Sequence, residues 1–394
     1  MNSRFYSVLV AGLMPMSAMA AGYYLPNQDA YATAMGNAFV ATADNPSAVF
    51  YNPAGMTQLK TPEAELNLYT INLAKTVTTD TERFKSKSPW QAVPALFYVA
   101  PINDKLSWGI GSYSPYGLGA DWGQGSPFRT VVTSAKLIYS NTALAIGYNI
   151  TDTLSIGASA SVVYTNLELE QGLGVAPLDF LQIKADGFTA AGELGLRWAP
   201  TPEHAFGLTA STATSQRLSG KVYSNILGTG DGDISFKTPM RVAFGYSYKP
   251  APGWNLEANI EWLDWDSLND LTATSLHLPG HAISVPFDWQ SMFIYEVGVS
   301  HTWENGYTVA AGYDYNSNAQ PDTHYNPVIG DADFQSFNVG FGRKLDCWSW
   351  FLTYQLGYAN RNVNGDVNTP AGQNANGKYH EVNNAIVLSA GYKF

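Results

Sequence analysis

Few residues of this chain are of types that could carry out catalysis or hold a metal ion. Cys347 is the only cysteine, so no disulfide can form within the chain. His277 and His281 are spaced four apart, but Pro279 and Gly280 lie between them, so the helical spacing of a zinc site does not apply. No phosphate-binding loop and no Gly-x-Ser-x-Gly motif is present. The sequence predicts no metal site, no cofactor and no enzyme, although spacing does not exclude a Ser, a His and an acid that converge in space.

Arg197 and Arg241 are the charged residues best suited to bind a ligand. Both lie in segments in which polar and apolar residues alternate, on the face that is predicted below to point inward. A guanidinium on that face could hold the carboxylate of a ligand. The alternative, which we favour, is that both arginines pair with acids, since buried charges are normally paired. The acids on the predicted inner face are Glu193, Glu257, Glu261, Glu296 and Asp314.

An apolar segment, residues 268–285, is the third feature with a possible binding role. It contains Leu276 and Leu278, although its predicted place between two strands makes it an extracellular loop. Exposed apolar patches usually serve binding or are covered by another part of the protein. The segment is therefore either a landing site for a hydrophobic ligand or packs against a neighbouring loop.

The composition indicates the scaffold that must position these residues. Only 13% of the 394 residues are charged, which is about half the proportion in soluble domains. Yet the sequence has no run of about 18 apolar residues that could form a membrane-spanning helix. With 11 Trp, 24 Tyr, 18 Phe and 36 Gly, the chain fits a membrane β-barrel, in which lipid-facing residues alternate with residues of a polar lumen. The net charge of −11 argues against nucleic acid as a partner.

Alternation with a period of two predicts fourteen antiparallel strands that close into a barrel. In the last strand, Ile386, Leu388 and Ala390 share one face. The links between strands are alternately short and long, as is typical of periplasmic turns and extracellular loops, and an even number of strands returns both termini to the periplasm. The predicted strands span residues 63–77, 92–101, 104–116, 133–150, 153–168, 184–199, 203–219, 233–250, 253–266, 290–303, 306–317, 333–345, 347–361 and 379–394.

Two regions precede the predicted barrel. Residues 1–20 combine Arg4, a short apolar core and the small-residue cleavage site Ala18-Met19-Ala20, so they form a signal peptide and predict export to the outer membrane of a Gram-negative bacterium. Residues 21–61 are predicted to form short helices and turns. A fourteen-stranded barrel is too wide to be filled by side chains alone. We therefore expect residues 21–61 to plug the lumen and residues 62–394 to form the barrel.

Several short motifs follow one another in a distinctive order. Residues 21–25 (AGYYL), residues 35–38 (MGNA) and Asn52-Pro53-Ala54 lie in the expected plug, and residues 99–105 and 114–119 lie in the barrel. In this order they resemble the FadL/TodX family of outer-membrane transporters of long-chain fatty acids and hydrophobic compounds. The resemblance implies a fourteen-stranded barrel with an N-terminal hatch, in agreement with the strand number taken from spacing.

The resemblance also implies a transport route. Extracellular loops capture the substrate, a pocket above the hatch receives it, and a kink in the third strand releases it sideways into the membrane. The Asn-Pro-Ala motif would then take part in gating by the hatch. The kink is expected within residues 108–114, where Gly109 and Gly111 make irregular pairing easier.

One departure from the family pattern bears on the substrate. Members that carry fatty acids hold the carboxylate with basic residues on strands that resemble residues 153–168 and 290–303, and neither segment contains Lys or Arg here. The predicted function is passive import of a fatty acid or an uncharged hydrocarbon. The expected partners besides the substrate are outer-membrane lipid and lipopolysaccharide and the barrel-assembly machinery, with the protein itself a monomer. A general porin or an adhesin on the same scaffold is the alternative, and the plug argues against an open porin.

Overall fold

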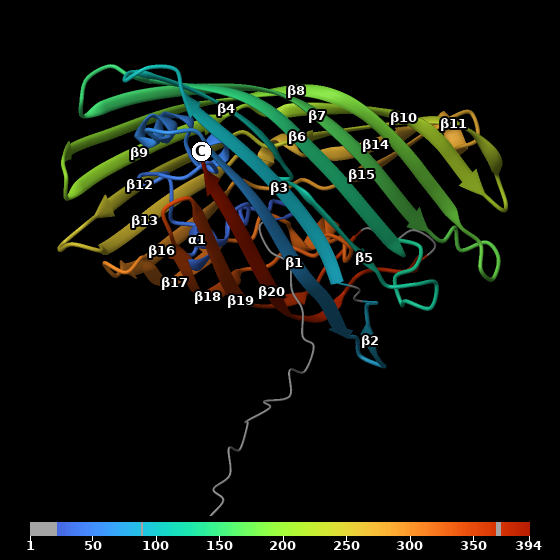
Figure 1. Cartoon of the computed structure of the whole chain (residues 1–394). Coiled ribbons are helices and arrows are strands. Elements are labelled where there is room, and N and C mark those ends of the chain that lie inside the picture. The colour runs from blue at the N-terminus through green and yellow to red at the C-terminus, as the bar shows by residue number, and fades with distance from the viewer. Residues whose placement is uncertain (1–21, 88–89, 368–371) are drawn as a thin grey trace, which may run out of the picture.

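The computed structural model describes residues 22–87, 90–367 and 372–394, so the predicted signal peptide lies outside the described residues. The described residues form one closed antiparallel β-barrel (Figure 1). The barrel closes where β1 pairs with β20 in unbroken register, from Glu63 opposite Lys393 to Thr78 opposite Lys378.

Within the described residues, nineteen of the twenty strand segments make up the fourteen strands of the barrel, the number that the sequence predicts. Five barrel strands are each broken into two segments: β4 and β5, β9 and β10, β11 and β12, β13 and β14, and β15 and β16. The short β2 pairs with the tip of β1. The strand bounds are β1 Glu63–Thr78, β2 Arg83–Lys85, β3 Trp90–Pro101, β4 Leu106–Tyr113, β5 Gly117–Asp121, β6 Ser134–Asn149, β7 Leu154–Gln171, β8 Leu181–Thr201, β9 His204–Ser211, β10 Thr214–Ser224, β11 Gly228–Thr238, β12 Arg241–Tyr248, β13 Trp254–Leu263, β14 Asp270–Thr274, β15 Ala282–Pro286, β16 Met292–Thr302, β17 Tyr307–Asn316, β18 Phe334–Lys344, β19 Trp348–Val363 and β20 Gly377–Lys393.

The outer face of the barrel carries an apolar band. Leu144, Val162 and Leu194 lie on neighbouring strands, and 61%, 59% and 65% of their surfaces are exposed. Their neighbours along each strand point inward, so the period-two alternation seen in the sequence separates an apolar exterior from the interior. None of the helices in the described part of the chain is both long and apolar enough to cross a membrane.

Two segments that the sequence predicts as loops are mostly strand. Residues 220–232 contain the ends of β10 and β11, which meet at a turn of residues 225–227, and residues 267–289 contain the β14–β15 hairpin. The inward-facing Val222 and Ile234 are fully buried. Charged side chains on the outer face of these extensions hide the alternation from a reading of the sequence.

Residues 22–61, which we call the inner segment, lie inside the barrel at the end with the short turns (Figure 1). They contain α1 (Ala30–Ala34), α2 (Ala48–Tyr51) and the 3₁₀ helix η1 (Pro53–Gln58), while the 3₁₀ turns η2 (Trp265–Ser267), η3 (Pro279–His281) and η4 (Asp322–His324) lie outside it. α1 packs on β17–β20, and η1 packs on β4 and β6–β8. Glycines of the inner barrel face make room for it: a side chain at Gly312 would collide with Met35, and one at Gly207 with Val40. Barrel wall and inner segment are therefore complementary in shape.

Candidate functional site

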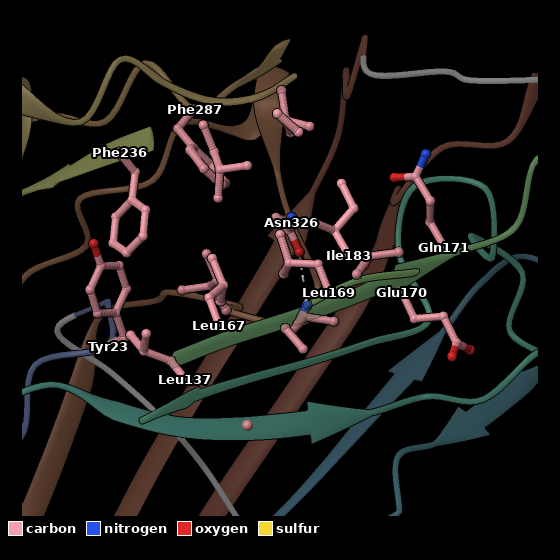
Figure 2. A pocket seen from close by; sticks show the side chains of 18 of the residues that line it. Tyr23, Leu137, Leu167, Leu169, Glu170, Gln171, Ile183, Phe236, Phe287 and Asn326 are labelled. Atoms are coloured by element: carbon pink, nitrogen blue, oxygen red, sulfur yellow. Dashed lines mark hydrogen bonds between the residues drawn. The ribbon is translucent and has the colours of Figure 1, made fainter. Parts of the chain in front are cut away.

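A large apolar cavity lies between the inner segment and the end of the barrel that carries the long loops. Its empty volume is about 1100 Å³, including the space at its mouth. Its walls come from β5–β8, β11 and the β14–β15 hairpin (Figure 2). Leu137, Leu167 and Phe236 are among the side chains that line it, whereas Glu170 and Gln171 lie at its edge in this view. The cavity is thus lined mainly by apolar side chains and is large enough for an apolar small molecule.

Tyr23, at the start of the inner segment, closes the cavity on the side of the inner segment. Its ring packs edge-on against Trp265 and Tyr116, with centroid distances of 4.8 and 5.7 Å, and against Trp289 at 6.1 Å. Aromatic contacts of this kind stabilise a defined ring position. Figure 2 shows the ring beside Phe236. Tyr23 is therefore both part of the inner segment and part of the cavity wall.

The third strand of the barrel is broken beside Tyr23. β4 ends at Tyr113 opposite Asn141 of β6, and β5 begins at Gly117 opposite Ile138, so three residues face two and form a bulge. β3 pairs with β4 but forms no backbone ladder with β5 among the described residues. The backbone ladder of the cavity wall consequently has a gap between β3 and β5, which the Gln91 side chain of β3 bridges by donating to the carbonyl oxygen of Gly119 at 3.1 Å.

The inner segment pairs with the broken strand at this point. The N–H of Leu25 donates to the carbonyl oxygen of Pro115 at 2.7 Å, and the N–H of Gly117 donates to that of Tyr23 at 3.0 Å. Tyr24 and Tyr116 form an isolated antiparallel bridge between these two bonds. The start of the inner segment therefore acts as a short added strand beside the break.

The sequence placed the irregularity within residues 108–114, and the observed break overlaps that range only at Ser114. Gly109 and Gly111 lie in the regularly paired part of β4. A side chain at either position would come within 2.8 to 3.0 Å of Val49 in the inner segment. These glycines therefore allow close packing of the inner segment, and the break itself is held by Gln28, whose side chain donates to the carbonyl oxygen of Ser114 at 2.9 Å and accepts from its N–H at 3.2 Å.

Asn52 ties the inner segment to itself and to the barrel. Its Nδ2 donates to the carbonyl oxygens of Val40 at 2.8 Å and of Leu196 in β8 at 3.1 Å. Its Oδ1 accepts from the N–H of Ala54 at 3.1 Å, and Pro53 opens η1 in the position that proline favours. The Asn-Pro-Ala motif thus anchors the inner segment to β8 of the barrel wall.

Arg241 is fully engaged by protein groups. Its guanidinium lies 3.3 Å from a carboxylate oxygen of Glu193 and 3.2 Å from one of Glu261, and it donates to the hydroxyl of Tyr24 at 3.0 Å. The side chains of Arg241 and both acids are at most 8% exposed. This pairing matches the favoured expectation and links the barrel wall to the inner segment through Tyr24.

Arg197 does not pair with Glu193, the acid four residues before it on the same strand. Its Nε donates instead to the carbonyl oxygen of Ala41 in the inner segment at 2.8 Å. Glu257 reaches the same turn from β13 and accepts from the N–H groups of Ala41 and Thr42 at 2.7 and 3.0 Å. Arg197 thus helps hold the inner segment, and it does not reach the apolar cavity.

The described residues that line the cavity include no Lys and no Arg. Three largely buried cations in this half of the barrel each have an acidic partner. They are Lys75 with Glu381, Arg129 with Asp179, and Arg361 with Asp322. The cavity therefore offers no free cation to a ligand carboxylate.

The apolar segment 268–285 contributes to the cavity through strand residues rather than through the leucines singled out from the sequence. Leu271 and Val285, on the β14–β15 hairpin, line the cavity. Leu278 is buried in the core at 3% exposure, whereas Leu276 is 82% exposed. One face of the segment thus packs inward while its tip stays in solvent, and the landing site for a ligand stays a prediction.

The exposed Leu276 has apolar neighbours at the tips of adjacent loops. Val175, Leu178 and Ile226 are likewise exposed. The loops are joined by hydrogen bonds from the Asn225 side chain to the Leu178 carbonyl oxygen and between the His277 ring and the Leu227 carbonyl oxygen, both at 3.3 Å. We call Val175, Leu178, Ile226 and Leu276 the apolar rim.

The loop that carries part of this rim is built around one carboxylate. Burial of Asp179 opposes its ionisation, but the N–H groups of Ala176, Leu173 and Val175, together with Arg129, outweigh this effect and hold the pKa of Asp179 well below its usual range. The loop therefore keeps a charged centre at any pH at which the cell lives.

Sequence reasoning missed Tyr23, Tyr24 and Gln28 as parts of the site. Their roles depend on pairing with a strand about ninety residues away, which no local pattern reveals. A signal for the break did exist, because Pro115 lacks the N–H that a strand interior requires.

Comparisons with known proteins agree with this geometry. Residues 11–394 match the model of the family described as outer membrane protein transport protein (OMPP1/FadL/TodX). The chain is 22% identical over 378 residues to the long-chain fatty acid transport protein of Escherichia coli O6:H1, covering 82% of this chain and 84% of that protein. It is 24% identical over 383 residues to outer membrane protein P1 of Haemophilus influenzae, covering 81% of each.

Solved structures show the same fold. A FadL homologue of Pseudomonas aeruginosa superimposes with a TM-score of 0.85 at 18% identity, over 95% of this chain and all (100%) of that one. The toluene transporter TodX of Pseudomonas putida gives a TM-score of 0.76 at 21% identity, over 93% of this chain and 98% of that one. Family, relatives and barrel place the protein in the outer membrane of a Gram-negative bacterium. The chain belongs to the OMPP1/FadL/TodX family of outer-membrane transport proteins.

Proposed function

We propose that this protein imports uncharged hydrophobic small molecules, with hydrocarbons as the substrate class. The observation that supports this most strongly is the apolar cavity of about 1100 Å³ without Lys or Arg among its described lining residues. Burial of apolar ligand surface there is favourable by about 25 cal/mol per Å². A carboxylate in the same place would lose its hydration without a cation to replace it.

Capture begins at the apolar rim. An exposed apolar patch at the extracellular end provides the first contact for a molecule that is poorly soluble in water. The β14–β15 hairpin leads from Leu276 at the rim to Leu271 and Val285 in the cavity wall. A substrate therefore moves along one continuous apolar element into the cavity.

Release is lateral, through the gap between β3 and β5. A hydrocarbon is far more soluble in the bilayer than in the periplasm, so an exit into the membrane follows the free-energy gradient. Gly117 and Leu118 of β5 already form part of the cavity wall beside the broken strand. No nucleotide-binding motif is present in the sequence, and we take transport to be driven by diffusion.

The inner segment is the gate in this proposal. Tyr23 touches the cavity, and its backbone pairs with Gly117 at the break. A substrate that moves the Tyr23 ring would disturb this pairing and open the gap. Asn52 and Arg197 would hold the rest of the inner segment in place while its first residues move.

Long-chain fatty acids are the second candidate substrate, because relatives of 22% identity are named long-chain fatty acid transport proteins. An acyl chain would fit the apolar cavity. Its carboxylate would then remain in the hydrated mouth, since Arg129 near the mouth is already held by Asp179.

The test is uptake by outer-membrane vesicles that contain the full-length protein, with labelled toluene and labelled oleate compared at equal concentrations. We expect saturable uptake of toluene, which excess unlabelled hydrocarbon abolishes. Saturable uptake of oleate alone would replace the first candidate by the second. Uptake of neither, with small polar solutes also excluded, would favour a surface-interaction protein.

A further inference from the structure

A cluster of buried acids and amides lies between the inner segment and β13–β18, apart from the apolar cavity. Glu296 of β16 and Asp314 of β17 are directly opposite each other in register. They are only 3% and 4% exposed. Two like charges in directly opposed positions of a sheet destabilise it. Neither acid belongs to an ion pair among the described residues, and the nearby Arg241 is taken by Glu193 and Glu261.

The side-chain N–H groups of the amides around the two acids already donate hydrogen bonds, while some of the acceptor oxygens in the cluster have no partner. The Asn259 Nδ2 donates to Glu296 Oε2 at 2.9 Å. The Nδ2 groups of Asn338 and Asn316 donate to Asp314 at 3.1 and 2.8 Å. In the described structure Glu296 Oε1 and Asn338 Oδ1 are buried without any hydrogen-bond partner. Buried acceptors without a donor need a partner, and a bound cation is one such partner.

The inner segment brings a third such oxygen to this place. Gly36 and Asn37 both have positive φ, 68° and 64°, and the turn that they form packs against the backbone of Tyr313. The Asn37 carbonyl oxygen accepts from Asn259 at 3.4 Å. Its side chain lines a second cavity of about 420 Å³, whose lining is part polar and part apolar, together with Asp314, and its Oδ1 is buried without a partner in the described structure.

We propose that Glu296, Asp314, Asn37 and Asn338 form a binding site for a Ca²⁺ ion that ties the inner segment to the barrel wall. Two carboxylates balance the charge of a divalent cation, and carboxylate and amide oxygens are the ligands that Ca²⁺ takes. The described residues hold no group of three or more His, Cys, Asp or Glu side chains suited to a metal ion, so the site would rest on two carboxylates together with amide oxygens. Of the four residues, Asp314 and Asn37 line the adjoining cavity, from which water can complete the coordination. Mg²⁺ fits less well because it demands strict octahedral geometry at shorter distances.

The site differs from the transport route in position and in chemistry. It lies on the β16–β18 side and is built from oxygens, whereas the apolar cavity is lined from β5–β8, β11 and the β14–β15 hairpin. The inference therefore does not depend on which hydrophobic molecule the protein carries. It concerns how firmly the inner segment is held.

The test is equilibrium dialysis of the purified full-length protein in detergent against ⁴⁵Ca²⁺, after removal of bound ions with a chelator. We expect one saturable Ca²⁺ site per chain. Glu296→Gln removes one charge and should weaken binding at least about tenfold. Asn37→Gly removes the carboxamide, and glycine tolerates the positive φ of 64° at this position, so this variant should weaken binding without straining the turn. The matched control is Glu193→Gln, which neutralises another buried lumenal glutamate but leaves this cluster intact.

Four outcomes would overturn the proposal: no saturable binding to the wild type, equal weakening in Glu193→Gln, unchanged binding in both cluster variants, or a Mg²⁺ preference. Ca²⁺ held by co-purified lipopolysaccharide is common to all variants and cancels in the comparison. Folding of each variant is checked by the shift of its electrophoretic mobility on heating. If Glu296→Gln does not fold, Asn37→Gly, which changes no charge and suits the positive φ, carries the test by itself.

Discussion

The backbone N–H of Gly117 donates a 3.0 Å hydrogen bond to the carbonyl oxygen of Tyr23. This bond joins the start of the inner segment to the broken third strand, while the Tyr23 ring lines the apolar cavity. Tyr23 thus lies between the apolar cavity and the broken strand. Under the proposed function, a movement of Tyr23 would couple the cavity to the strand break without any movement of the barrel as a whole.

A disulfide across this junction should lock it. Tyr24 and Tyr116 form an isolated antiparallel bridge, and Cα atoms so paired lie within the range that a disulfide spans. In a Cys347→Ser background, we expect the oxidised Tyr24→Cys/Tyr116→Cys protein to lose most hydrocarbon uptake. A reductant should restore it. The reduced double variant and each single variant serve as controls, and full uptake by the oxidised protein would show that these residues need not separate.

Arg241 should matter for stability and not for recognition of a carboxylate. Its removal leaves Glu193 and Glu261 buried without a counter-charge, which typically costs about 3–5 kcal/mol. We expect Arg241→Met to lower the thermal unfolding midpoint clearly. Combining it with Glu193→Gln and Glu261→Gln should restore part of the loss. A selective loss of fatty acid binding, with stability unchanged, would instead identify Arg241 as a carboxylate ligand.

A cation introduced into the cavity should change the preferred substrate. Leu167 lines the cavity and is 5% exposed, so a lysine there brings its ammonium group to the ligand. We expect Leu167→Lys to bind oleate more tightly and toluene more weakly, by about tenfold each. Val367→Lys, at an exposed loop position outside the apolar rim, is the matched control and should leave the preference unchanged. Equal effects of both variants would mean that the net charge of the protein, and not the cavity, determines the substrate preference.

The sequence predicts the barrel well because a strand's alternation is a local property. The inward and outward faces of β20 follow from residues such as Ile386 and Leu388 alone. The ends of β10 and β11 are harder to predict, because they extend beyond the apolar band and carry charged side chains on their outer face. Lys221 and Asp231 are an example, and they form an ion pair at 2.5 Å. The charged side chains on the outer face make residues 220–232 resemble a loop, although Val222 on the inner face is buried.

The site was predictable only where its partners are close in sequence. Asn52 caps η1 by accepting a hydrogen bond from the N–H of Ala54, two residues further along the chain, and the Asn-Pro-Ala motif makes this cap visible in the sequence. Arg241 pairs with Glu193, 48 residues away, and that partnership follows from which strands face each other across the lumen. The spacing Glu193 to Arg197 suggested a different pair, because four residues along a strand share a face but stand too far apart for a short contact.

The loop around Asp179 should respond to acid in one direction. The folded pKa of Asp179 lies below the unfolded value of about 3.9, so its carboxylate stabilises the loop fully above that value and less as the pH falls below it. We expect amide exchange at residues 173–176 to be much faster in Asp179→Asn than in the wild type at pH 7. The difference should shrink below about pH 4, after correction for intrinsic rates. A difference that grows on acidification would contradict the role of the charged form.

Asn52→Ala should loosen the inner segment while the barrel still assembles. The substitution leaves the carbonyl oxygens of Val40 and Leu196 and the N–H of Ala54 without this partner, at a cost of about 1–3 kcal/mol. Because the barrel strands keep their ladders, we expect normal heat-modifiable mobility together with impaired hydrocarbon uptake in vesicles. Asn52→Asp keeps the oxygen that caps η1 but loses both donated bonds, so it separates capping from anchoring. If folded Asn52→Ala protein took up toluene at the wild-type rate, anchoring of the inner segment at Asn52 would have no part in gating.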